Sequence, residues 1–418
     1  MMNDLQDPIV ISGIGQVSPY GIDKELLWNV LFKTKSEIDQ LKKSRIGNID
    51  EENGLFIPSD WNPKELLGKR GLQFLNASTK YLMAATNLAL EHAQLSSETV
   101  NAEELGVVVG CNYTGLAVSI EYDQIAITEG PRYVSPMQAP NILANAPASH
   151  LGIRVQAQAC NTTISTGQCA GLDALGYSMN LLKRNRAKYV IVGGVEELNE
   201  SVIQYLKRSD HTPKNMTDKQ GIPYAPDSAG ILPSEGAVTV ILERKSTAID
   251  RGIQPLAELV SWDNVFAARK DESHRVAAVR RALTSVVNAA SASIEDIGLI
   301  FSGANGDYEI DRVELLALQE LLEMGEKQVN SPKVFPIKSV VGEAFGASGL
   351  FQLSGALGFL NKKKWPSPYG NDADQVDPTF ASLLNYNQAW TEENECPYIA
   401  LTSHSRSGET SAILIRST

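Results

Sequence analysis

Thiols and imidazoles are scarce in this chain, so their positions limit the chemistry it can do. The 418 residues include only five histidines and four cysteines, Cys111, Cys160, Cys169 and Cys396. The cysteines form no C-x-x-C pair and no histidine lies at zinc-binding spacing from them, so we expect no metal site and no cofactor. Cys169 lies in Ser165–Gly171, where a helical pattern begins, and a helix N-terminus favours the thiolate form of cysteine. The position of Cys169 on that helix therefore decides whether its thiol could act as a nucleophile.

The charge and the composition exclude several classes of function. The chain has 37 Lys and Arg against 49 Asp and Glu, a net charge of −12, so it is a poor partner for polyanions such as nucleic acids. Asp4 and Asp7 lie where a secretion signal would carry basic residues, and no apolar run approaches the ~18 residues that span a membrane. We expect a cytoplasmic globular protein that binds neither nucleic acid nor a membrane.

Buried strands and helices alternate along the sequence. Short apolar runs that end in small residues predict strands at 9–13, 106–110, 187–194, 238–242, 298–303 and 398–403. Helical spacing predicts helices over Leu26–Phe32 and Ser78–Gln94. This alternation is typical of an α/β protein whose sheets are covered on both faces.

Two segments of the chain resemble each other. Ala170–Leu175 leads to the basic stretch Lys183–Arg186, and Ser348–Leu353 leads to Asn361–Lys364 in the same register. Each segment predicts a helix with a small-residue face at its start and positive charge at its end, where the helix dipole favours it. Chance similarity between two Gly- and Ala-rich helices is the alternative. The separation of about half the chain favours an internal duplication.

Several motifs, in order and at matching spacing, resemble the β-ketoacyl synthases, the condensing enzymes of fatty-acid and polyketide synthesis. The motifs are Val10–Pro19 with Gly21, Gly130–Pro136, Ser165–Gly171 with Gly176, Asp227 with Ser234–Ala237, and Ile337–Ser339 with Gly342. The resemblance implies a duplicated thiolase-like fold of five αβαβα layers. We expect a ketosynthase-like half at 1–250 and a second at 251–418, packed as one unit.

The nucleophile position of that family is not a cysteine in this chain. The family's cysteine lies three residues before a glycine and eight before a second one, and counting back from Gly171 and Gly176 gives Gln168. Cys169 is one residue further along, and one residue turns a helix by about 100°, so its thiol should point elsewhere. We interpret Cys169 as a small buried core residue.

The other catalytic positions differ as well. The first family histidine lies eight residues before an aspartate, and counting back from Asp311 gives Gly303. The second follows Gly342, where this chain has Glu343, although the lysine five residues earlier is present as Lys338. The two phenylalanines of the family's gating loop become Ser405 and Ser407. His404 lies beside that loop and replaces neither histidine in the sequence.

A condensing fold without these groups resembles the chain length factor, or ketosynthase β, of type II polyketide synthases. That resemblance implies a heterodimer with an active ketosynthase α, in which the growing polyketide, delivered by an acyl carrier protein, enters an interface tunnel. The strand at about 157–165 would pair across the interface, or would be an ordinary core strand. The tunnel candidates, each of which could instead be core packing, are Leu116, Ser119, Tyr113, Tyr122, Met137 and Gln138.

Three other functions fit parts of the pattern. A malonyl-carrier-protein decarboxylase would also carry glutamine for the cysteine, but a carboxylate at Glu343 should repel the malonyl carboxylate and the enolate. A self-sufficient ketosynthase would have to use Cys169. A pure scaffold would lack any effect on product length.

Overall fold

The structure is a computed structural model. It describes residues 7–34, 36–38, 40–41, 46–49, 52–96, 100–209, 219–323, 332–364 and 397–418. Most of the described strands form one mixed sheet in the order β10-β9-β11-β12-β8-β1-β7-β6-β4-β5, and a separate hairpin pairs β2 (Ile46–Ile49) with β3 (Glu52–Leu55).

The large sheet consists of two halves with the same connectivity. One half contains β1 (Ile9–Val17), β7 (Gly236–Arg244), β6 (Tyr189–Glu196), β4 (Leu105–Gly110) and β5 (Cys160–Ile164). The other contains β8 (Ala257–Phe266), β12 (Glu409–Arg416), β11 (Tyr398–His404), β9 (Ile297–Phe301) and β10 (Lys333–Phe335). In each half, two antiparallel pairings are followed by two parallel ones. The fold is therefore duplicated, as the sequence echo predicts.

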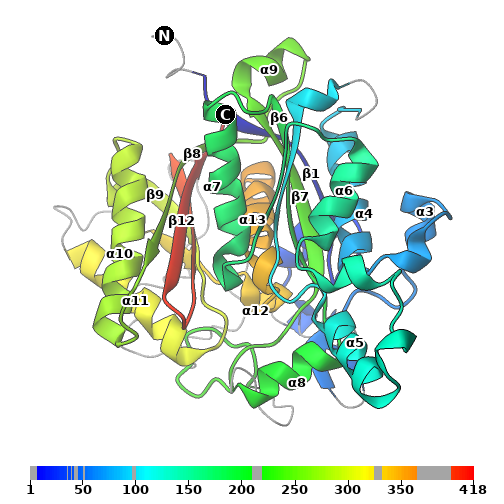
Figure 1. Ribbon diagram of the computed structural model, residues 1–418. Coiled ribbons are helices and arrows are strands. Elements are labelled where there is room, and N and C mark those ends of the chain that lie inside the picture. The colour runs from blue at the N-terminus through cyan, green and yellow to red at the C-terminus, as the bar shows by residue number, and fades with distance from the viewer. Residues whose placement is uncertain are drawn as a thin grey trace.

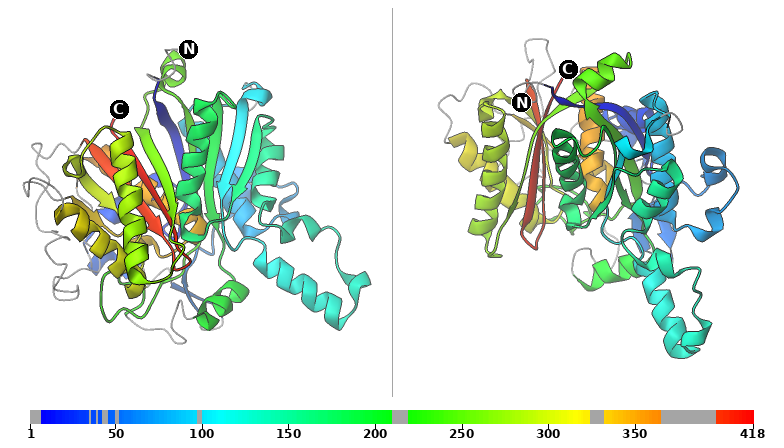
Figure 2. Two further views of the ribbon diagram at one scale, coloured as in Figure 1. Left: turned by 60° about the vertical axis from the view of Figure 1, so that its left-hand side comes forward. Right: turned by 45° about the horizontal axis from the view of Figure 1, so that its top comes forward.

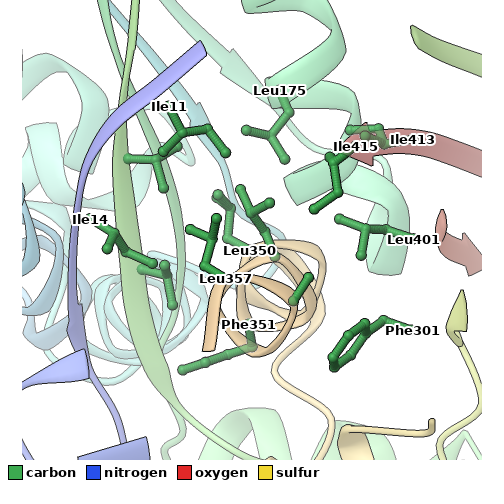
Figure 3. Close-up of a cluster of buried hydrophobic side chains, with 14 of the residues drawn as sticks. Ile11, Ile14, Leu175, Phe301, Leu350, Phe351, Leu357, Leu401, Ile413 and Ile415 are labelled. Atoms are coloured by element: carbon green, nitrogen blue, oxygen red, sulfur yellow. The ribbon is translucent and has the colours of Figure 1, made fainter. Parts of the chain in front are cut away.

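The two echo segments are the central helices, α7 (Ala170–Lys183) and α13 (Ser348–Lys362). The halves of the sheet pair only where β1 meets β8, at Ile9–Ile11, and then diverge around these helices (Figure 1). Leu350, Phe351 and Leu357 of α13 lie among side chains from both halves, as Figure 3 shows. The thiolase-like arrangement expected from the sequence is confirmed.

Helices cover the outer face of each half of the sheet. α4 (Ala77–His92) and α6 (Ala146–Val155) pack on the first half, and α10 (Glu272–Ala289) and α11 (Tyr308–Glu323) on the second. Alternation along β4 divides its side chains: Val107 and Val109 pack in the α4–α6 cluster, and Val108 in the central one. Five layers result.

Other described helices connect these elements along the chain. They are α1 (Lys24–Leu31), α3 (Pro63–Leu67), α5 (Leu116–Thr128), α8 (Glu200–Arg208), α9 (Lys245–Asp250) and α12 (Lys338–Val341). Short 3-10 turns, η5 (Gly167–Cys169) and η7 (Phe345–Ala347), precede α7 and α13, whereas η3 (Pro131–Tyr133) and η4 (Ala139–Ile142) follow α5. The segment from α5 to η4 projects from the body of the molecule (Figure 2).

The sequence locates most of this framework but misses five strands, β2, β3, β8, β10 and β12. The predicted helices correspond to α1 and α4, and the six predicted strands to β1, β4, β6, β7, β9 and β11. β8 is missed because polar residues interrupt its apolar run. A domain boundary at residue 250 stays a prediction.

Substitution of Gly176 tests the close packing of α7. A Cβ at Gly176 would lie 1.9 Å from a ring atom of Trp262 on β8. We expect Gly176→Ala to lower the free energy of unfolding by about 1–3 kcal/mol, because the Trp262 ring must move. Asn180→Ala, at an exposed position of the same helix, is the control and should change it by less than about 0.5 kcal/mol in urea denaturation. Equal stability of the two variants would contradict the packing described here.

Candidate functional site

Gln168 lies where β5 turns into α7. The left-handed backbone of Gly167, with φ of 59°, makes the turn, and Thr166 Oγ1 donates to Asp173 Oδ2 at 2.6 Å across it. Gln168 is buried, and its carbonyl accepts a 2.8 Å hydrogen bond from Ser403 Oγ on β11. The turn therefore presents an amide side chain at the start of a central helix.

Cys169 is directed into the protein. Its thiol lies 3.3 Å from the carbonyl oxygen of Ser403, and the residue is 1% exposed. Burial, helped by the charge of Asp173, raises the pKa of the thiol well above its usual value. The thiolate form is therefore disfavoured here, as expected of a core cysteine.

Lys338 brings Gly303 and Glu343 together. Its Nζ donates to the Gly303 carbonyl at 3.0 Å and to Glu343 Oε2 at 2.8 Å. The side chains of Lys338 and Glu343 are 1% and 0% exposed. Two positions forty residues apart in the sequence thus share one buried cation.

Glu343 is fully engaged by donors. Besides Lys338, Asn305 Nδ2 donates to Oε2 at 2.7 Å, and Oε1 accepts from Ser348 Oγ at 2.6 Å and the Phe345 amide at 2.9 Å. Burial alone would raise the pKa of Glu343, but Lys338 and these donors hold that pKa below its usual range. The carboxylate is ionised and structural in its contacts.

His404 lies against Gly303. A Cβ added at Gly303 would be 3.2 Å from His404 Cδ2, so the imidazole occupies the space that a side chain at 303 would need. His404 Nε2 lies 3.8 Å from Glu314 Oε2, and Glu314 Oε1 accepts the Gly303 amide at 3.1 Å. The sequence placed His404 near this region but gave no sign of the contact.

Glu314 was missed by the sequence reasoning, although a signal exists. It lies three residues after Asp311, so both carboxylates share one face of α11. Burial would raise the pKa of Glu314, and His404 and Thr402 lower it. Asp311 instead accepts backbone amides of Tyr224, Asn305 and Gly306, and burial raises its pKa to about 7.

The turn that carries Ser405 and Ser407 is held by polar contacts. Ser405 Oγ bonds Glu409 and lies 3.2 Å from Ser407 Oγ. Between them, Arg406 binds the buried Asp307 through two nitrogens, with Nη2 2.8 Å from Oδ1. The loop therefore has no aromatic gate and is joined to the segment before α11.

Three of the tunnel candidates lie together. The Tyr113 ring lies 4.9 Å from Phe345 and 5.5 Å from Tyr205, centroid to centroid, and Leu116 packs in the same cluster. Ser119 Oγ donates to the Ile142 carbonyl at 3.2 Å. Beside them, a surface groove of about 480 Å³ between α5 and α8 is lined in part by Leu116 and Tyr205.

The other three candidates lie on the projecting segment. Tyr122 donates from its hydroxyl to the Ser135 carbonyl at 2.8 Å, Met137 is 61% exposed, and Gln138 Oε1 accepts from Asn141 Nδ2 at 2.9 Å. None of the three lines the groove between α5 and α8.

A buried carboxylate fixes Tyr113 in place. Glu196, at the end of β6, accepts the amides of Asn112, Tyr113 and Gly346 at 2.8–3.2 Å. Burial raises the pKa of Glu196 to about 8 despite these donors. The loop after β4 and the turn before α13 are therefore joined through one side chain.

Neither a metal centre nor a membrane anchor is found in the described part of the chain. No group of three or more His, Cys, Asp or Glu residues there is arranged to hold a metal ion. None of the helices in those ranges is long and apolar enough to cross a membrane. Cys396 lies outside the described residues.

Neutralising Glu343 tests the buried ion pair. We expect Glu343→Gln to lower the free energy of unfolding by about 3 kcal/mol or more, because it leaves the Lys338 ammonium buried without its counter-ion. Glu25→Gln is the matched control: Glu25 pairs with Lys362 at the same 2.8 Å but at the surface, so the loss should stay below about 1 kcal/mol. Thermal and urea unfolding at neutral pH measure both.

Acid should also remove the contribution that ionised Glu343 makes to the free energy of unfolding. A carboxyl with a lowered folded pKa stabilises fully above its unfolded pKa of about 4.3, and the gain is lost as the pH falls further. Wild type and Glu343→Gln should therefore converge in stability on acidification. A constant difference down to low pH would contradict the assignment.

Comparison with known proteins gives the family. The β-ketoacyl synthase N-terminal domain matches residues 6–248, and the C-terminal domain matches residues 260–370. A Streptomyces halstedii protein provisionally named polyketide β-ketoacyl synthase 2 is 26% identical over 354 residues, which cover 83% of this chain and 84% of that protein. The 3-oxoacyl-[acyl-carrier-protein] synthase 2 of Vibrio cholerae is 26% identical over 349 residues, covering 82% and 83%.

Solved structures agree on the fold. The ishigamide ketosynthase/chain length factor structure superposes with a TM-score of 0.83 at 19% identity, covering 99% of both chains. A type II polyketide synthase acyl-carrier protein in complex with its ketosynthase bound to the hexaketide, AntDE:AntF, contains a chain with a TM-score of 0.80 at 18% identity, covering 99% of this chain and 100% of that one. With both domain models matched across most of its length, this chain belongs to the β-ketoacyl synthase family.

Proposed function

We propose that this chain is a non-catalytic ketosynthase-like subunit, a chain length factor that pairs with an active ketosynthase and limits the length of a polyketide. The observation that carries the proposal is Gln168 at the start of α7. An amide side chain cannot accept an acyl group, whereas condensation by this fold needs a nucleophile at that place. Cys169, the neighbouring thiol, is buried against the Ser403 carbonyl.

The groups around Gln168 support this reading. Gly303 offers no side chain, and Glu343 and Lys338 satisfy each other. An enolate or oxyanion needs donors aimed at the reacting oxygen, and neither of these positions supplies one. His404, the imidazole beside Gly303, is directed with Nε2 toward Glu314.

The decarboxylase alternative meets a different objection from the one expected from the sequence. Lys338 compensates the charge of Glu343 at 2.8 Å, so repulsion of a malonyl carboxylate by Glu343 is a weak argument. The stronger argument is the missing donor at both positions. Decarboxylation leaves an enolate, and neither position offers it a side-chain hydrogen-bond donor.

The surface of the chain suits a partner of the same fold. β5 is the last strand in the sheet order, is uncharged, and is only partly buried, so it offers an unpaired edge. No residue of α5 is buried although its sequence is largely apolar. Ile127, Tyr133, Met137 and Ile153 are 82%, 63%, 61% and 69% exposed. Apolar surface of this extent indicates an interface.

The partner and substrate follow from the relatives. One of the two similar structures is a ketosynthase/chain length factor, and the other is a ketosynthase in complex with its acyl-carrier protein. By this resemblance the partner is a ketosynthase α that carries the cysteine and both histidines, and the carrier protein acts on the complex. The growing chain would then meet this subunit near Tyr113, Leu116 and Ser119.

Reconstitution tests the absence of chemistry. The purified chain, given malonyl carrier protein, should release no CO2 and form no ketide, because it lacks both nucleophile and donors. With a ketosynthase α it should form a stable heterodimer that makes full-length product, measured by mass spectrometry. Condensation or decarboxylation by the chain alone would refute the proposal.

Product length tests the position of the tunnel wall. Leu116→Trp adds bulk beside Tyr113, so the heterodimer should make shorter ketides at an unchanged level of assembly. Ile249→Trp, on the half-exposed α9, is the control and should leave the product unchanged. Unaltered product length from an intact Leu116→Trp complex would show that this side chain does not face the growing chain.

A further inference from the structure

We propose that polar groups at the former catalytic positions form a permanent double seal, an inner Lys338–Glu343 pair and an outer Arg406–Asp307 clamp, that keeps the space around Gln168 closed to thioester substrates. The inference rests on the proposed function and adds to it. A chain that had merely lost its nucleophile would still open to substrate. This one is held shut.

The inner pair joins three segments of the chain. Glu343 receives donors from Asn305 in the loop after β9, from Lys338 on α12 and from Ser348 at the start of α13. Its own backbone is also fixed, since its amide donates to the Leu232 carbonyl at 2.8 Å and its carbonyl accepts the Ser234 amide at 2.9 Å. Moving any of these segments would leave a charge buried without its partners, which strongly opposes opening.

The outer clamp crosses the β11–β12 turn. Arg406 stands between Ser405 and Ser407. Its guanidinium makes a two-nitrogen contact with Asp307, which is the geometry of the strongest ion pairs. Asp307 is 4% exposed in its side chain, so the pair is partly shielded from water. A turn that needs mobility to admit a substrate is thereby anchored.

Asn305 contacts both the inner pair and the outer clamp. Its Nδ2 donates to Glu343 Oε2 at 2.7 Å, and its Oδ1 accepts the Asp307 amide at 3.0 Å. The inner pair and the outer clamp therefore hold the same loop from both sides. Breaking the inner pair or the outer clamp should therefore weaken the other, so we expect the two to stabilise the closed state cooperatively.

His404 adds a steric block to the polar ones. A side chain at 303 would begin 3.2 Å from His404 Cδ2, which is a tight contact, so a histidine at 303 requires His404 to shift. His404 is buried on β11 beside Glu314 and follows Ser403, which bonds the Gln168 carbonyl. Consecutive residues of β11 thus contact the Gln168 turn, through Ser403, and the Gly303 position, through His404.

Thiol accessibility at residue 168 tests the seal. Gln168→Cys places a reporter thiol at the site, and its alkylation by iodoacetamide is followed by peptide mass spectrometry that separates residue 168 from Cys169. We expect slow alkylation in the full chain. Adding Arg406→Gly should raise the rate by about tenfold or more, because labelling follows the population of the open state.

A matched pair elsewhere controls for general loosening. Arg416 binds Glu258 through two nitrogens at 2.9 and 3.1 Å and is 43% exposed in its side chain, against 39% for Arg406. Arg416→Gly should therefore leave labelling at residue 168 unchanged. Should Arg406→Gly prevent folding, Asn305→Ala serves as the second variant and should also speed labelling.

Two outcomes would overturn the seal. One is rapid alkylation of Gln168→Cys alone, at the rate of an unhindered thiol. The other is equal labelling in the Arg406→Gly and Arg416→Gly backgrounds. Both readouts are independent of catalysis, so either can fail while the wild-type chain remains inert toward malonyl carrier protein. Conversely, an active wild-type chain would refute the proposed function without any labelling experiment.

Discussion

The close contact between α7 and the start of α13 is the constraint on which the rest of the molecule depends. A Cβ at Gly171 would lie 2.9 Å from the Gly346 carbonyl, and one at Gly349 would lie 2.7 Å from the Leu172 amide. Only glycine permits backbones to approach this closely. Two halves of a sheet can pack on one shared helical layer because that layer is thin.

This contact also places the candidate site. Gln168 lies in the turn just before α7 and Glu343 lies five residues before α13, so bringing the two helix starts together brings these positions into one region. Polar side chains there cannot reach water and must satisfy one another. Lys338, Glu343 and Asn305 do so completely. We interpret the result as a catalytic site whose groups now hold the fold.

The interior and the surface of the chain differ in what they offer. Inside, Lys338 and Glu343 pair with each other, and burial disfavours the thiolate form of Cys169. Outside, the edge of β5 and the apolar α5 segment present groups that a monomer gains nothing by exposing. A protein whose central polar groups are buried and whose edge strand β5 is exposed is suited to completing another protein's site.

The sequence determined the family and most strands, because motif spacing and apolar periodicity are local properties, and it predicted which residues stand at the family's catalytic positions. It also predicted the inert Cys169, since one helical step suffices for that argument. The contact of His404 with Gly303, the Arg406–Asp307 clamp and the network around Glu343 came only from the tertiary structure. These contacts join residues that are distant in the chain, and strand register and helix packing, not sequence spacing, decide which of them meet.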